Sequence, residues 1–497
     1  MNYFQPYALD ETIVAAWDSQ IAETPWLAQS AAAQSADLFP RFATCYAKLR
    51  ALPRGSRRAL QRQLARSQGP AAIPLEWQPK LARALAGAAL LLALRQGSVQ
   101  AATITVNTNI PKILADGKCS LVEAMVNAND TATGQPYADC AAGDPTGADT
   151  IILRKGTQTL VDFYYYGLGL PPVTSQITIQ GNGAKIVRAK NAPDFGLFLV
   201  RSYGGDLTLN NLTLSGGTQY VGAVSNHGTL RITNCVITGN RAVSGGGIYN
   251  RGLGYISDST ISTNRATFGG GVFNIGSLRI INSVITGNTA SGFGGGVDNA
   301  YSISLSIENS TITKNSSDNG GGVSNYGGTF KISNSTISKN TAIHDGGGVY
   351  NNPAYDGSSS SIIGSTITGN SSVRGGGVFN SRNNYSYGFK TTLSISNSTI
   401  SKNSATNGGG IFSEYPGAGL ATMLYVNQNS TIQGNKAGND GGGVYNGSYF
   451  YLDNSAISKN SAGARGGGVF NATPYVFSPT NSTISGNKAA VGPNVFL

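Results

Sequence analysis

The sequence predicts an all-β protein, a right-handed single-stranded parallel β-helix, with a short capping helix and a helical N-terminal extension. A GGG run followed by Val or Ile, one variable residue and usually Asn recurs from residue 245 to residue 466, and RGGGVFN stands unchanged at 374–380 and 465–471. A second motif, NSTISKN or a close variant, alternates with it on a period of 24 to 33 residues. Periods of this size indicate stacked supersecondary units. A β-propeller is the alternative, which is disfavoured because each unit has too few strands for a blade.

The composition supports an array of turns and short strands. The 497 residues include 67 glycines, and only 12% of them are charged against 40% apolar. The formal net charge is +11, but only one basic cluster is concentrated. It is predicted to lie on an exposed helix, either as a solvated face or as a contact for a membrane surface or nucleic acid. Its members are Lys48, Arg50, Arg54, Arg57, Arg58, Arg62 and Arg66. The remaining basic residues are scattered, which argues against a nucleic-acid partner.

Residues 1–80 are predicted to form the helical N-terminal extension, and residues 81–101 resemble a signal peptide. The apolar run LARALAGAALLLAL at 81–94 is shorter than the roughly 20 residues of a membrane span. Small residues at Val99 and Ala101 suit a cleavage site, so we expect export with a mature N-terminus near Ala102. The alternative is a buried helix of an ordinary N-terminal domain. No stable membrane span is expected beyond this segment.

Residues 102–200 are predicted to hold a cap and the first β coils. Ser120 and Glu123 have the spacing of a capping box, which predicts a short helix over CSLVEAMVNAN. A helix there suits a cap over the open end of a stacked structure. Cys119 and Cys140 lie 21 residues apart and can pair in an oxidising compartment, whereas Cys235 replaces a repeat Ser and is predicted to be a small buried residue.

The segment CSLVEAMVNAN, followed by a second Cys and GADTIIL, resembles the C-S-L-R-E-A domain that precedes right-handed β-helices in bacterial secreted and surface proteins. Val122 stands where that family has Arg, and the resemblance covers roughly residues 102–160. The repeats beyond it, residues 201–497, resemble those of polymorphic outer-membrane proteins. The resemblance implies a pectate-lyase-like solenoid and a secreted, cell-surface or outer-membrane location.

Alternation of apolar and polar residues assigns the two faces of each strand. In GGGVxN the Val or Ile is predicted to point inward and the next residue outward. Asn and Gly are predicted to form the corners, where a column of Asn can bond through successive coils. Each coil then supplies three short strands. The Ile of each NSTISKN-type motif is predicted to point inward: Ile237, Ile261, Ile285, Ile312, Ile337, Ile367, Ile400, Ile432, Ile457 and Ile484.

No catalytic constellation, metal site or cofactor site is predicted. Polysaccharide lyases and glycoside hydrolases of the β-helix type need clustered carboxylates. Asp345 and Asp440 both precede a GGG run, but three coils, about 14 Å, separate them. Asp298 is predicted to be a solvated surface carboxylate, and His227 and His344 are predicted to lie in turns without a catalytic acid nearby.

Three long loops carry the predicted ligand-binding residues. The coils that begin at 346, 375 and 408 have extra residues after the same GGGVxN strand, and insertions at one corner of a solenoid gather on one face. The aromatic and basic residues there predict binding of a glycan or a protein partner, with inert loop decoration as the alternative. They are Tyr355, Arg382, Tyr385, Tyr387, Phe389, Lys390, Tyr415 and Tyr425. The sequence therefore predicts a non-enzymatic secreted or cell-surface protein with an adhesive or structural role, and a polysaccharide-cleaving β-helix enzyme is the alternative.

Overall fold

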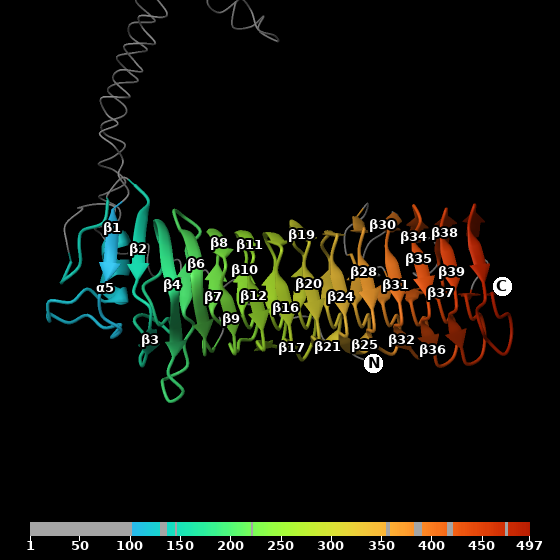
Figure 1. The fold of residues 1–497 in the computed structure, drawn as a ribbon, viewed down its shortest axis with the longest axis horizontal. Coiled ribbons are helices and arrows are strands. Elements are labelled where there is room, and N and C mark those ends of the chain that lie inside the picture. Colours follow the sequence, from blue (N-terminus) through green and yellow to red (C-terminus); the bar gives the residue numbers. More distant parts are fainter. Residues whose placement is uncertain are drawn as a thin grey trace, which may run out of the picture. The chain divides into compact units, whose positions relative to one another are not determined.

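The computed structural model describes residues 102–129, 137–144, 147–219, 222–353, 358–381, 390–414, 421–472 and 476–497. The predicted helical extension at 1–80 and the signal-like segment at 81–101 lie outside these residues. The chain divides into two units, Met1–Val99 and Gln100–Leu497, and only the second contains described residues. That unit is a right-handed parallel β-helix whose coils stack side by side along one axis (Figure 1).

Two ladders of parallel strands form the widest sheet, and each coil contributes one strand to each ladder. The first ladder contains β8 (Thr229–Thr233), β11 (Leu253–Ser257), β15 (Ser277–Ile281), β19 (Ser304–Glu308), β23 (Phe330–Ser333), β27 (Ser359–Ile363), β30 (Lys390–Ser396), β34 (Ala421–Asn427), β38 (Tyr449–Asp453) and β42 (Phe477–Thr480). The second contains β9 (Val236–Thr238), β12 (Thr260–Ser262), β16 (Val284–Thr286), β20 (Thr311–Thr313), β24 (Thr336–Ser338), β28 (Thr366–Thr368), β31 (Thr399–Ser401), β35 (Thr431–Gln433), β39 (Ala456–Ser458) and β43 (Thr483–Ser485).

The nine GGG motifs supply nine strands of a separate 12-stranded sheet, and β5, β7 and β44 complete it. Its strands are β5 (Phe198–Val200), β7 (Val224–Asn226), β10 (Ile248–Asn250), β14 (Val272–Asn274), β18 (Val297–Ala300), β22 (Val323–Tyr326), β26 (Val349–Asn352), β29 (Val378–Asn380), β33 (Ile411–Ser413), β37 (Val444–Asn446), β41 (Val469–Asn471) and β44 (Val495–Phe496). The predicted three strands per coil are thus present. All ten predicted inward Ile side chains pack in the core, nine of them fully buried and Ile484 partly buried in the last coil.

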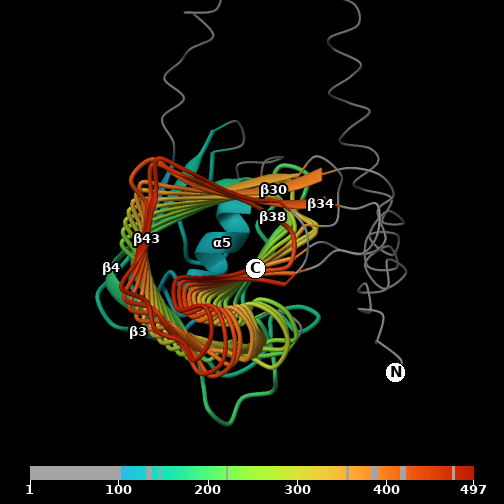
Figure 2. The same ribbon diagram turned by 90° about the vertical axis from the view of Figure 1, so that its right-hand side faces the viewer.

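A fourth, short strand follows the second ladder in the middle coils, and the sequence analysis did not predict it. These strands are β13 (Arg265–Ala266), β17 (Thr289–Ala290), β21 (Ser316–Asn319), β25 (Thr341–Asp345), β32 (Ser404–Ala405), β36 (Lys436–Ala437) and β40 (Ser461–Ala462). These strands lie in the segment that connects the second-ladder strand of each coil to its GGG run, and we call this segment the excursion. Figure 2, which looks along the stack, shows this excursion as a second, smaller lobe in the outline of the coils.

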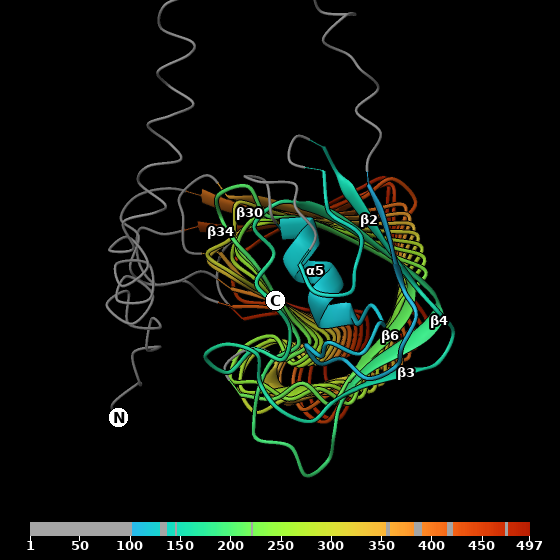
Figure 3. The same ribbon diagram turned by 90° about the vertical axis from the view of Figure 1, so that its left-hand side faces the viewer.

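The helix α5 (Leu121–Asn129) lies across the N-terminal end of the stack (Figure 3). The predicted capping box is present, because Ser120 N–H donates to Glu123 Oε2 at 2.9 Å and Glu123 N–H donates to Ser120 Oγ at 3.3 Å. A disulfide joins Cys119 to Cys140 beside the helix. The first coils are built from β1 (Thr103–Val106), β2 (Asp149–Leu153), β3 (Thr157–Leu160), β4 (Gln176–Arg188) and β6 (Asp206–Ser215).

Buried Asn side chains form the predicted column through the coils. Asn315 is typical: its Nδ2 donates to Asn340 Oδ1 and to Ile285 O, both at 3.0 Å, and its Oδ1 accepts from the N–H and the Nδ2 of Asn288. The last Asn of every NSTISKN-type motif belongs to this column: Asn240, Asn264, Asn288, Asn315, Asn340, Asn370, Asn403, Asn435, Asn460 and Asn487. A Ser column runs beside it, and Cys235, which is 1% exposed, takes the first Ser position as predicted.

A second Asn column follows the 12-stranded sheet and is interrupted once. Asn351 Nδ2 donates to Asn380 Oδ1 at 2.8 Å, but Ser413 occupies the next position in register. Both side chains are buried, and because the serine is too short to continue the column, Asn380 Nδ2 and Ser413 Oγ have no hydrogen-bond partner. The column resumes between Asn446 and Asn471 at 2.7 Å. This break leaves one unsatisfied polar group in each of two neighbouring coils, those that carry the second and the third long loop.

The three glycines of RGGGVFN have separate structural reasons. Gly375 adopts φ of +65°, a left-handed conformation that other residues rarely adopt. A Cβ on Gly376 would lie 2.4 Å from Ser404 O, and a Cβ on Gly377 would lie 2.6 Å from Gly410 O. The first glycine therefore makes the corner, and the other two let neighbouring coils approach closely.

Candidate functional site

The predicted long-loop face is only partly within the described residues. Tyr355, Arg382, Tyr385, Tyr387, Phe389 and Tyr415 lie outside them, and of Lys390 only the backbone, which begins β30, is described. The three long connections join β26 to β27, β29 to β30 and β33 to β34, so they leave the same corner of three successive coils. Tyr425 on β34 is the one predicted ligand-binding side chain that the structure describes.

Tyr425 points away from the core and stacks on a second tyrosine. Its neighbours in the strand, Leu424 and Val426, are fully buried, so alternation places Tyr425 on the outer face. Tyr451 of β38 lies in register with it, and the two rings stack at 4.8 Å between centroids with an interplanar angle of 11°. Partial burial, and then the neighbouring Tyr451, raise the pKa of Tyr425. The pair forms a partly exposed aromatic surface on β34, the strand into which the third loop leads, and on the neighbouring strand β38.

The outward residues of GGGVxN do not form an exposed column. They point away from the core as predicted, but most of them are buried, including Tyr350, Phe379 and Phe412 at 7%, 1% and 7% exposure. Their rings stack at 5.3 and 5.6 Å between centroids. Each excursion folds back over this face, so the column is a second apolar core rather than a ligand-binding surface.

Two arginines from the excursions cover the aromatic column. The Arg374 guanidinium lies 4.9 Å from the centroid of the Phe379 ring, and that of Arg465 lies 4.5 Å from the Phe470 ring. Arg374 also holds Asp345 with two hydrogen bonds at 2.7 and 2.8 Å, and Arg465 holds Asp440 in the same way.

The two acids that precede GGG runs therefore have structural partners. Burial raises the pKa of Asp345, and Arg374 offsets only part of this effect. Arg374 also pairs with Glu414 at 2.7 Å. These carboxylates hold the excursions against the coil, and each is bound to an arginine rather than facing an open hollow.

Asp298 departs from the prediction of a solvated surface carboxylate. Its side chain is 1% exposed, and its Oδ1 has no hydrogen-bond partner. It lies in the aromatic column, in register between Phe273 and Ser324, where the covering excursion excludes water. Burial raises the pKa of Asp298 to about 7, and the hydroxyl of Ser324 lowers it to a smaller extent. The prediction was wrong because a side chain that points away from the main core can still be covered, here by the excursion that packs over it.

His227 lies in a turn, as predicted, but His344 lies within strand β25, so the turn prediction was wrong there, because the fourth strand of the coil had not been predicted. The Nε2 of His227 lies 3.1 Å from Ser225 Oγ, and its ring lies 5.8 Å from the Tyr249 ring at the end of the aromatic column. The carbonyl of His344 accepts two backbone N–H groups, those of Val373 and Arg374, both at 2.9 Å. These contacts stabilise the connections between neighbouring coils.

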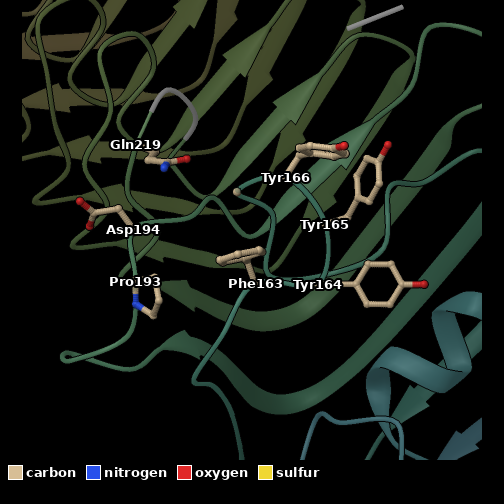
Figure 4. Close-up of a pocket in the computed structure, with 8 residues that line it drawn as sticks. Phe163, Tyr164, Tyr165, Tyr166, Pro193, Asp194 and Gln219 are labelled. Atoms are coloured by element: carbon tan, nitrogen blue, oxygen red, sulfur yellow. The ribbon is translucent and has the colours of Figure 1, made fainter. Parts of the chain in front are cut away.

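An aromatic hollow near the first coils was not singled out from the sequence. It has a volume of about 640 Å³ and is lined by Phe163, Tyr164, Tyr165, Tyr166, Gly167, Pro193, Asp194 and Gln219. Figure 4 shows Asp194, Pro193 and Gln219 on one side of the hollow and the tyrosines on the other, with Phe163 between them. The run DFYYYG at 162–167 could have indicated it. Successive residues of a strand point to opposite faces, so four adjacent aromatic side chains cannot all enter the core, and some of them must lie on the surface.

The fold and these surfaces define a parallel β-solenoid with aromatic groups on its outside. Within the residues that the structure describes, no three His, Cys, Asp or Glu side chains are grouped to hold a metal ion. No helix in the same part of the chain is long and apolar enough to cross a membrane. Comparisons with protein-family models, curated proteins and solved structures find no match to this chain.

Proposed function

We propose that this protein is an exported, non-enzymatic β-helix that acts at or outside the cell surface in adhesion or surface structure. The stacked pair Tyr425 and Tyr451 carries the proposal, because it places a partly exposed aromatic surface on β34, the strand that follows the third long connection, and on the neighbouring strand β38. Tyrosine supplies an apolar ring and a hydroxyl, a combination suited to recognition surfaces. A glycan or a protein surface is the expected ligand.

The environment of the acidic residues supports binding rather than catalysis. A glycosidase needs two carboxyl groups about 5 to 10 Å apart that flank a substrate. Asp345 and Glu414 are neighbours, but both are paired with the same arginine, Arg374, while Arg465 holds Asp440. Asp298 is buried beneath an excursion. The resemblance of residues 119–129 to the C-S-L-R-E-A motif, together with the disulfide between Cys119 and Cys140, supports an oxidising, extracytoplasmic location.

Three experiments test this proposal. Mass spectrometry of the exported protein should find a mature N-terminus near Ala102, whereas an intact Met1 on exported protein contradicts cleavage. Glycan arrays should show binding that falls at least about tenfold when Tyr425→Ala and Tyr451→Ala are combined, the loss expected from about 1.4 kcal/mol of contact energy. Tyr385→Ala with Tyr387→Ala tests the loop residues in the same assay. Breakdown of acidic or neutral glycans, with or without calcium, would establish the enzymatic alternative instead.

A further inference from the structure

The hollow at Phe163–Tyr166 exposes an unusual run of aromatic side chains. Phe163, Tyr164, Tyr165 and Tyr166 are 50%, 41%, 38% and 65% exposed, although they are adjacent in the chain. Contiguous apolar surface of this kind is rare on a soluble fold unless it contacts something. The rings line one concave site of about 640 Å³, within the range of about 300 to 1,000 Å³ typical of small-ligand pockets.

The backbone beneath these rings is held in one conformation. The N–H of Tyr164 donates to Leu168 O at 2.7 Å, and the N–H of Leu168 donates back to Tyr165 O at 2.9 Å. Tyr166 has φ of +35°, an uncommon conformation for a residue with a bulky side chain. Such strain persists only where surrounding contacts impose it, and it gathers at binding sites. The turn therefore presents its aromatic rings without the entropy loss of ordering a loose loop.

The opposite wall of the hollow is organised by a buried arginine. Arg188 donates from Nη1 to the carbonyl oxygens of Ala192 at 2.7 Å and Pro193 at 3.3 Å, and its Nη2 lies 3.4 Å from Asp194 Oδ1. A backbone hydrogen bond joins the two walls, since Gly169 N–H donates to Gly196 O at 2.8 Å. The Arg188 side chain is only 10% exposed, so it positions this wall and offers little charge to the hollow.

The chemistry of the lining selects the ligand. Aromatic faces favour flat apolar surfaces, while the 68% exposed carboxylate of Asp194 and the amide of Gln219 offer hydrogen bonds to hydroxyl groups. The pocket lining contains no lysine or arginine, and Asp194 repels anions, so nucleic acids and acidic glycans are disfavoured. We propose that this hollow is a binding site for a neutral oligosaccharide, whose sugar rings stack on Phe163 and Tyr166 and whose hydroxyls bond to Asp194 and Gln219.

Titration calorimetry of the full chain with neutral hexasaccharides, namely β-1,4-linked glucose, xylose and N-acetylglucosamine and α-1,4-linked glucose, tests the site. At least one should bind, and Tyr166→Asn should weaken that binding at least about tenfold, the loss expected for one ring contact of about 1.4 kcal/mol. Asparagine tolerates the left-handed backbone at this position, so the turn should keep its shape. Tyr166→Phe keeps the ring and should retain most of the affinity.

Two controls separate this site from the long-loop face. Tyr203→Ala removes a tyrosine that is 91% exposed and outside the hollow, and it should leave the affinity unchanged. The combined Tyr425→Ala and Tyr451→Ala variant should also leave the hexasaccharide affinity unchanged. The two variants therefore show separately whether the hollow binds sugar and whether the Tyr425 and Tyr451 surface does. The proposal is overturned if none of the four hexasaccharides binds, if Tyr166→Asn binds as tightly as the parent, or if only acidic glycans or nucleic acids bind.

Discussion

Replacing the buried carboxyl of Asp298 with an amide should make the protein more stable at alkaline pH and leave it nearly unchanged at acidic pH. Asp298 is 1% exposed, and burial raises its pKa from 3.8 to about 7. The folded state therefore holds its proton more tightly than the unfolded state. Because the unfolded chain ionises first, stability is fully present below about pH 4, falls as the pH rises to about 7, and then stays low.

The size of the effect follows from the shift in pKa. A difference of about three units, from 3.8 to about 7, corresponds to about 4 kcal/mol of stability lost by the parent between pH 4 and pH 8. Asp298→Asn keeps the side-chain shape and removes the charge. The stability difference between variant and parent should consequently be small at pH 4 and approach about 4 kcal/mol at pH 8.

Chemical denaturation followed by circular dichroism at both pH values measures this difference. Stacked repeats can unfold in segments, so amide hydrogen exchange in β18 should be measured alongside to report the local opening energy. Asp258→Asn is the matched control, because Asp258 is exposed to solvent and the same substitution there removes no buried carboxyl. An equal stability difference at pH 4 and pH 8 for Asp298→Asn would refute the assignment of a buried, protonated carboxyl.

Three further substitutions, one of them paired with a control substitution, test what holds the coils together. Asn315→Ala removes four buried side-chain hydrogen bonds and should cost about 4 kcal/mol of unfolding free energy, while Asn309→Gly, at an exposed corner with φ of +49°, should cost little. Gly376→Ala places a Cβ 2.4 Å from a carbonyl oxygen of the next coil and should lower stability by at least about 2 kcal/mol, seen as a lower denaturation midpoint. Ser413→Asn should supply the missing acceptor for Asn380 Nδ2 and raise stability by about 1 to 2 kcal/mol in the same assay; a loss of stability would show that the corner cannot hold the larger side chain.

Local chemistry made the coil itself predictable from the sequence. Alternation assigned Ile312 and its equivalents to the core, since a strand turns successive side chains to opposite faces. The capping box placed α5 correctly, because Ser120 and Glu123 satisfy each other's backbone N–H groups within one turn. The Asn column was predictable because Asn recurs at the same corner of every coil, so stacking brings each Asn next to the one in the neighbouring coil.

The candidate sites were less predictable. Of the long-loop residues, the structure describes the side chain of Tyr425 alone, and the prediction of ligand binding there stays a prediction. Its partner Tyr451 lies 26 residues further along the chain and adjoins it only because β34 and β38 pair in register. The run DFYYYG indicated one wall of the hollow at Phe163. Its opposite wall comes from Pro193, Asp194 and Gln219, which are distant in the sequence, so no local pattern predicted that the two walls face each other.

The sequence by itself determined which residues turn, which alternate and which repeat, because each of these properties depends on neighbours within one coil. The tertiary structure decided which outward side chains meet water. Each excursion folds back over the 12-stranded sheet and covers its outer face. Phe379 and Asp298 both occupy the outward position of GGGVxN, which alternation alone would expose to solvent, and both are buried because of this cover. Burial depends on what packs against a face from elsewhere in the chain, and no local pattern contains that information.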